Sequence, residues 1–189
     1  MKRAIAKLKS VSPYSQSRVI ESLKGDREKS ADYEARTWKE RCHKTTDGHI
    51  YIPPMAFANS LKEAAKYLSI QIQGQGKATY TKNFEAGVMV LEPLVLPNTI
   101  SEVKGETYFV PSDGKAGGGK RVMKTFPVIP SWSGTVEYVI LDDIIGEDIF
   151  RRVLVASGTL IGIGRFRPRN RGYYGRFSVE SIEWLEETI

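Results

Sequence analysis

Two amphipathic helical patterns, each set between strand patterns, constrain the fold of this chain more than any other feature of its sequence. The first lies in "PPMAFANSLKEAAKYL". Its apolar side chains recur at the spacing of one helix face: Phe57, Leu61, Ala64, Ala65 and Leu68. Pro53 holds the residue before it extended, and Pro54 suits the first position of a helix. We therefore predict that this helix begins at Pro54.

The second helical pattern lies in "EDIFRRVLVASG". Ile149, Val153 and Ala156 define its apolar face, and acids fill its first turn, where they suit the positive end of the helix dipole. Asp143 is a candidate N-cap and Gly158 a candidate end. The sequence thus predicts a second amphipathic helix in this stretch.

Strand patterns surround both helices. In "RAIAKLKSV", Ala4, Ala6 and Leu8 fall on one face of a strand, and Ile5, Lys7 and Lys9 fall on the other. Further strands are predicted in "FEAGVMVLEPLVL", "GTVEYVILDD" and "RFSVESIEW". In the first of these, Pro93 either ends the strand or marks a β-bulge. The order strand, helix, strand, strand, helix, strand is that of an α+β, ferredoxin-like (RRM-like) βαββαβ core.

Two long insertions interrupt this core. One covers residues 12–48 and is rich in charge, with a short helix predicted around "DYEARTWKERC"; the other covers residues 97–132. A chain of 189 residues is one domain by default, so we predict a single domain over 1–189. Within the second insertion, "ETYFV" and "RVMKTFPVI" flank a glycine-lysine loop, which suggests a thumb-like hairpin.

Composition narrows the class of protein. The net charge is +6 and the pI about 9.3, which favours a polyanionic partner. Cys42 is the single cysteine, so an internal disulfide is excluded and a cysteine-based zinc site is disfavoured. We see no apolar run of the ~20 residues that a membrane span needs, and no secretory signal in "MKRAIAKLKSVSPYS". We predict a cytoplasmic protein without a metal or other cofactor.

The positive charge is concentrated in "IGIGRFRPRNRGYYGRF", residues 161–177, here called the arginine segment. It contains five arginines, four glycines, four aromatic residues and no acid. Glycine allows close approach, arginine matches phosphate oxygens, and aromatic rings stack on bases. If the segment is extended, its alternating arginines share one side. The candidate nucleic-acid-binding residues here are Arg165, Arg167, Arg169, Arg171, Tyr173, Tyr174, Arg176, Gly162 and Gly164. The alternative is a solvated arginine-rich loop.

Further candidate contacts lie outside this segment. Asn59, Lys62 and Lys66 fall on the first helix, where the alternative is a solvated face. In "DGKAGGGKRVMK" the candidates are Lys115, Lys120, Arg121 and Lys124. This loop has the spacing of a phosphate-binding P-loop, but an arginine takes the hydroxyl position and no helix follows. We therefore interpret it as a thumb that folds over a nucleic-acid strand, or as a plain flexible hairpin.

Two stretches resemble a known family. "IYIPPMAFANSLKEAAKYL" resembles the segment that opens the first helix of the RAMP superfamily of CRISPR-associated RNA-binding proteins, and "IGIGRFRPRNRGYYGRFSVESIEW" resembles its glycine-rich loop before the last strand. The resemblance is closest to the backbone subunits that polymerise along guide RNA. Met55, Ala56 and Phe57 stand where the family prefers Gly and Ser, and Glu63 replaces a small residue, which indicates a divergent, repurposed member.

The resemblance implies a protein that binds the phosphate backbone of single-stranded guide RNA. Whether it also binds DNA is not implied. Its protein partners would be further copies of itself, in a homo-oligomer or filament, or CRISPR effector proteins in antiviral defence. One alternative is an anti-CRISPR-like interaction protein that mimics or blocks an effector subunit. Another is an endoribonuclease that uses His43 or His49, or Asp26 or Asp32. We favour a protein without catalytic residues.

Overall fold

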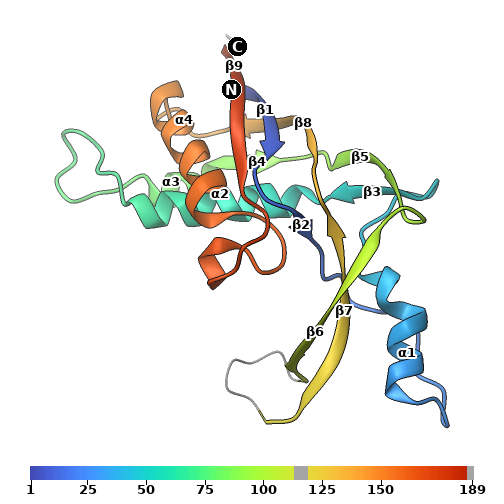
Figure 1. Cartoon of the computed structure of the whole chain (residues 1–189). Coiled ribbons are helices and arrows are strands. Elements are labelled where there is room, and N and C mark those ends of the chain that lie inside the picture. The colour runs from blue at the N-terminus through green and yellow to red at the C-terminus, as the bar shows by residue number, and fades with distance from the viewer. Residues whose placement is uncertain (113–118, 187–189) are drawn as a thin grey trace.

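A four-stranded antiparallel sheet forms the centre of the molecule. The computed structural model describes residues 1–112 and 119–186. The sheet has the order β4-β8-β1-β9, and its strands are β1 (Lys2–Ser10), β4 (Val88–Val90), β8 (Ser133–Ile140) and β9 (Phe177–Glu186). The two main helices, α2 (Pro54–Leu68) and α4 (Glu147–Ala156), connect β1 to β4 and β8 to β9 (Figure 1). Order and pairing confirm the predicted ferredoxin-like α+β core.

The core lies between this sheet and the two helices. Ala4, Ala6 and Leu8 are fully buried, as the alternation in β1 predicts. Two alanines in the central strand leave room for large rings from neighbouring elements, and Phe150 of α4 packs edge-on against Tyr138 of β8 with ring centroids 5.3 Å apart. The apolar stripe of α2 is buried throughout its first three turns.

The opposite face of the sheet carries ion pairs. Arg3 of β1 pairs with Glu137 of β8 at 2.6 Å, and Lys7 pairs with Glu180 of β9 at 3.4 Å. None of the described residues that the register of β1, β8 and β9 places on this face is aromatic. This face therefore has no ring on which a nucleic-acid base can stack.

The strand predicted in "FEAGVMVLEPLVL" is divided into three elements. Phe84 belongs to a helix, α3 (Thr81–Gly87), because its ring stacks on Phe150 in the core. Only β4 joins the main sheet; after Pro93, β5 (Leu94–Thr99) pairs instead with β3 (His49–Ile52). The prediction of one continuous strand was therefore wrong, whereas the interruption at Pro93 is confirmed.

The start of α4 also differs from the prediction. The N-cap is Gly146, which has no side chain to make a capping hydrogen bond, so the predicted cap at Asp143 is wrong. The neighbouring Asp142 organises the turn, because its Oδ1 accepts a hydrogen bond of 3.1 Å from the Ile144 backbone. The acids of the first turn, Glu147 and Asp148, are where the sequence predicts them.

The two insertions pack against each other beside the core. The second contains the thumb hairpin, formed by β6 (Lys104–Pro111) and β7 (Arg121–Ile129), which pairs through β7 with β2 (Tyr14–Ser15). The hairpin runs away from the main sheet, and α1 (Ser30–Thr37) lies at its side (Figure 1). A 3₁₀ turn, η1 (Trp38–Arg41), follows α1. Together, α1 and η1 confirm the short helix predicted around "DYEARTWKERC". Gly105 of β6 leaves room for the ring of Trp38.

A buried ion pair holds these insertions together. The Arg41 guanidinium donates to both oxygens of Glu34, at 2.7 and 3.0 Å, and also to the Thr125 carbonyl of β7 at 2.9 Å. The same carboxylate accepts the Thr125 backbone N–H at 2.6 Å. Strand β7 of the thumb hairpin is therefore fixed to the first insertion by polar contacts at Thr125. Among the helices of residues 1–112 and 119–186, none is long and apolar enough to span a membrane.

Candidate nucleic-acid interface

The arginine segment folds into a compact, internally bonded loop. It begins in a π-helical turn, η2 (Ser157–Ile161), passes through a 3₁₀ turn, η3 (Pro168–Asn170), and enters β9. Its two ends pair, since the Ile163 N–H donates to the Gly175 carbonyl at 3.0 Å and the Tyr174 N–H donates to Phe166 at 3.0 Å. The segment is therefore not extended, which overturns the premise on which its alternating arginines were expected to share one side.

The glycines of this segment lie against the protein's own backbone. Gly164 has a φ of 75°, and a side chain there would meet the Ser15 carbonyl at 2.5 Å. Gly162, with a φ of 74°, lies close to Pro168 in the same way. The Arg165 N–H donates to Ser15 at 2.9 Å, which ties the loop to β2. Glycine here serves close packing of the loop onto the core.

Arg165 is held between aromatic rings. Its guanidinium carbon lies 3.1 Å from the ring centre of Phe126 in β7 and 3.6 Å from that of Phe166. Burial lowers the pKa of Arg165 to about 10, so the side chain remains charged at neutral pH. Its Nη1 is buried without a hydrogen-bond partner, and no carboxylate in the described part of the chain pairs with it. Arg165 thus offers a fixed, unneutralised charge.

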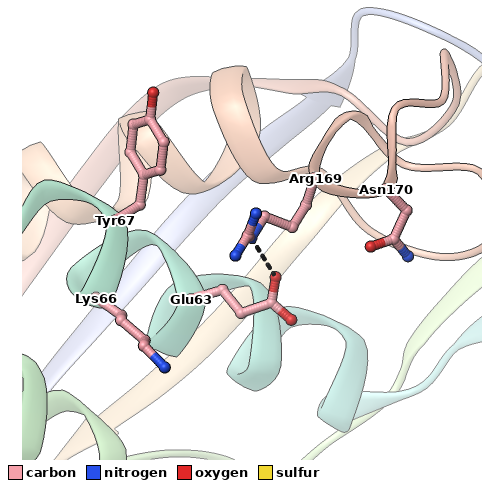
Figure 2. Close-up of a pocket in the computed structure, with 5 residues that line it drawn as sticks. All are labelled: Glu63, Lys66, Tyr67, Arg169 and Asn170. Atoms are coloured by element: carbon pink, nitrogen blue, oxygen red, sulfur yellow. Dashed lines mark ion pairs between the residues drawn. The ribbon is translucent and has the colours of Figure 1, made fainter.

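Arg167 and Arg169 converge on one carboxylate of α2. Arg167 Nη2 lies 2.6 Å from Glu63 Oε1, and Arg169 Nε lies 3.8 Å from Glu63 Oε2. Figure 2 shows Glu63 pointing from α2 toward Arg169, across a hollow that Lys66 and Tyr67 also border. Arg169 is the more accessible partner, with 55% of its side chain exposed against 19% for Arg167.

The two tyrosines of the segment differ in environment. Tyr174 is buried, and its hydroxyl donates to Glu106 of β6 at 2.5 Å and contacts the hydroxyl of Tyr108. These hydroxyls, Tyr108 first, stabilise the charged carboxylate and lower the pKa of Glu106. Tyr174 therefore joins the loop to the thumb hairpin. Tyr173 is exposed, with its ring in an edge contact with that of Tyr174 at a centroid distance of 5.7 Å.

The remaining arginines of the segment point elsewhere. Arg171 is exposed in a left-handed conformation, with a φ of 61°. Arg176 Nε donates to the Thr159 carbonyl at 3.2 Å, and the side chain lines a separate apolar hollow with Val11 and Val155. Arg176 is thus separated from the other arginines by the loop itself.

Only some of the predicted contact residues on α2 and the thumb hairpin lie in hollows with the arginines. Asn59 and Lys66 are exposed and line hollows that also contain arginines, whereas Lys62 is half-buried. Lys124 lies in a hollow with Arg165. The guanidinium of Arg121 lies over the Phe109 ring, with the carbon 5.4 Å from the ring centre. Two candidates lie farther along the hairpin: Lys120, which is exposed, and Lys115, which lies outside the described residues.

Three hollows adjoin one another along α2, the arginine segment and the thumb hairpin. Their volumes are about 600, 330 and 300 Å³. The second and third share Ser17 and Arg165, and the Arg167–Glu63 pair connects the second to the first. We call this region the basic surface. Its described cations are Lys66, Arg169, Arg167, Arg165, Arg41 and Lys124, of which Arg41 is already paired with Glu34. Glu63 is the single acid among the described lining residues.

Several residues of the basic surface were not predicted. Tyr67 is exposed beside Lys66, and His43 and Gln16 line the middle hollow. Tyr67 follows Lys66 directly on the helix, so its position is readable from the helical pattern. The placement of His43 and Gln16 depends on the path of the first insertion, for which the sequence carries no periodic signal.

The comparisons with known proteins are limited. No family model and no curated protein matches the chain. Among solved structures, a chain described as "CRISPR RNA-guided surveillance complex" matches with a TM-score of 0.42 and 11% sequence identity, over 98% of this chain and 71% of that chain. A similarity of this extent does not by itself assign a function.

Proposed function

We propose that this chain binds single-stranded RNA along the basic surface and holds it mainly by its phosphates. One observation carries the proposal: six cations from four separate parts of the sequence line three adjoining hollows, whose described lining residues include a single acid. Phosphate contacts by lysine and arginine supply most of the affinity of sequence-independent binding. Such binding is steeply weakened by salt.

Exposed aromatic rings near the basic surface favour a single-stranded nucleic acid over a duplex. The exposed rings of Tyr67 and Tyr173 lie on α2 and the arginine segment, which both border the surface. Exposed rings of this kind stack on unpaired bases, whose faces are hidden in a duplex. The preference for RNA over DNA rests on the resemblance of residues 50–68 and 161–184 to RAMP proteins.

The same resemblance supports a place in an assembly. We propose that the chain acts as a RAMP-like, CRISPR-associated backbone-type subunit in the cytoplasm, with copies side by side along the RNA. An anti-CRISPR-like protein with the same surface would bind effector proteins but not isolated RNA. Failure to bind isolated RNA would therefore distinguish it from a backbone-type subunit.

No contact in the described residues supports an endoribonuclease. His43 lines the middle hollow, but Asp26 and Asp32 are exposed on the first insertion without a described contact to it. Cleavage would need a positioned acid–base pair at the scissile phosphate. RNA that stays intact during long incubation with magnesium is the expected result.

The test is a salt series with labelled single-stranded RNA. Changing Lys66, Lys124 and Arg169 to glutamine removes three charges from the basic surface without touching the packed Arg165. We expect the slope of log K against log salt to become shallower by about 2, because each lost phosphate contact removes about 0.7 for a single strand.

A matched variant controls for total charge. Lys7, Lys9 and Arg152 are on the open sheet face or on α4, away from the three hollows, and their change to glutamine also removes three charges. We expect its slope to change by less than about 1, since salt at 0.1 M screens charges beyond about 10 Å. Equal slopes for the two variants, or an absence of binding by the unmodified protein, would contradict the proposal.

The affinity should also depend on pH through His43. Burial, with a smaller effect from Arg18, lowers the pKa of His43, so the imidazole is neutral at pH 7. Protonation, at a pH below the ordinary range of histidine, adds a positive charge to the middle hollow, so affinity for RNA should rise by about threefold as the pH falls. We expect His43→Gln to remove this rise and His49→Gln, outside the hollows, to keep it. A rise that survives His43→Gln would refute this assignment.

A further inference from the structure

We propose that Glu63 is a built-in competitor of phosphate that limits the affinity of the basic surface for RNA. This inference rests on the proposed function, because it concerns how strongly the same surface binds. Glu63 is the only acid among the described residues that line the three hollows. It lies on the exposed side of α2, opposite the buried stripe of Phe57, Leu61 and Ala64.

The carboxylate occupies the place where a phosphate would be held. Arg167 Nη2 approaches Oε1 to 2.6 Å, and Arg169 Nε approaches Oε2 to 3.8 Å. Arginine binds carboxylate and phosphate with the same planar donors. A nucleic-acid strand can use these two arginines only by displacing Glu63 or by sharing them with it.

The pairing is incomplete, which allows exchange. Arg167 Nε and Glu63 Oε2 are both buried atoms without a hydrogen-bond partner in the described residues. The two charged oxygens of a phosphodiester accept hydrogen bonds from arginine as a carboxylate does, and a strand in the hollow can place them between both arginines. The contact is therefore weaker than a fully satisfied pair such as Arg41 with Glu34, which uses both carboxylate oxygens.

The hollow beside Glu63 gives a strand access to this exchange. Lys66 and Tyr67 are exposed on the next turn of α2, and Asn170 is exposed on the facing loop (Figure 2). These groups leave room for a nucleotide next to the ion pair, in a hollow of about 600 Å³. The negative charge of Glu63 repels a phosphate that enters this hollow. The same charge partly neutralises Arg167 and Arg169.

The test is the affinity of Glu63→Gln for single-stranded RNA at ~0.1 M salt, where charges within about 10 Å still interact. Glutamine keeps the size and a carbonyl acceptor for Arg167, so the loop stays in place while the charge is lost. We expect affinity to rise by about three- to tenfold, equally for oligo(U), oligo(A) and oligo(C). The slope of log K against log salt should steepen by about 0.7, the value of one additional phosphate contact.

The control is Glu147→Gln, which also releases an arginine, Arg151, from an ion pair of 3.0 Å. It lies on α4, outside the hollows, and should change affinity by less than about twofold because of screening. An unchanged or weaker affinity of Glu63→Gln, with the unmodified protein still binding RNA, would overturn this inference alone. Loss of binding for only one base would assign Glu63 to base recognition and also overturn it. Absence of RNA binding by every variant would overturn the proposed function instead.

Discussion

Gly175→Ala is expected to lower the free energy of unfolding by about 3 kcal/mol or more. Gly175 has a φ of 78°, and an added Cβ would lie 1.8 Å from the Ile163 carbonyl. The backbone on both sides is fixed, because the Gly175 N–H donates to Pro13 at 2.7 Å and its carbonyl accepts from Ile163. The loop must open to admit the methyl group. Urea unfolding followed by circular dichroism measures the change.

Gly74→Ala separates crowding from backbone strain. Gly74 has the same φ of 78°, but no atom lies within 4 Å of an added Cβ. We expect a loss of only about 1 kcal/mol, the cost of a left-handed conformation for a non-glycine residue. Equal losses for the two variants would show that the close contact at Gly175 is not tight in solution.

Glu34→Ala is expected to destabilise the protein by about 3 kcal/mol, because it leaves the Arg41 charge buried without a partner. Only 8% of the Arg41 side chain and 14% of the Glu34 side chain are exposed. The Thr125 N–H of β7 also loses its acceptor. Hydrogen exchange should accelerate in β7 together with α1, since the pair joins the two insertions.

Glu21→Ala is the matched control for this pair. Glu21 also contacts an arginine, Arg18, but 72% of its side chain is exposed. Exposed pairs contribute little, so we expect a change below about 0.5 kcal/mol. A loss at Glu34 no larger than that at Glu21 would mean that the insertions are held by packing alone.

The core was predictable because its periodicity is local. The spacing of Phe57 and Leu61 indicated α2, and the alternation of Ala4 and Leu8 indicated β1, since each pattern reflects one buried face. The division of residues 84–96 was not predictable in the same way. Phe84 is apolar in either structure, and its helix is selected by a distant contact, the stacking on Phe150.

The candidate site was predictable in composition but not in geometry. The sequence indicated which segment carries the arginines, yet Phe166 and Arg171 adopt left-handed conformations that turn successive side chains apart. Arg165 is directed onto Phe126, a residue of the thumb hairpin. Glu63 and Arg167 pair although they are 104 residues apart, and no local pattern reports such a contact.

The measurement that tests the central claim most directly is photo-crosslinking of the protein to 4-thiouridine-labelled single-stranded RNA, with the crosslinked peptides identified by mass spectrometry. The exposed ring of Tyr67 borders the basic surface and that of Tyr173 lies on the arginine segment, whereas the opposite face of the sheet carries ion pairs and no described aromatic residue. The account predicts crosslinks in α2 and in the arginine segment, concentrated at these two tyrosines and lost at high salt. Crosslinks that instead concentrate on β1, β8 and β9 would contradict it.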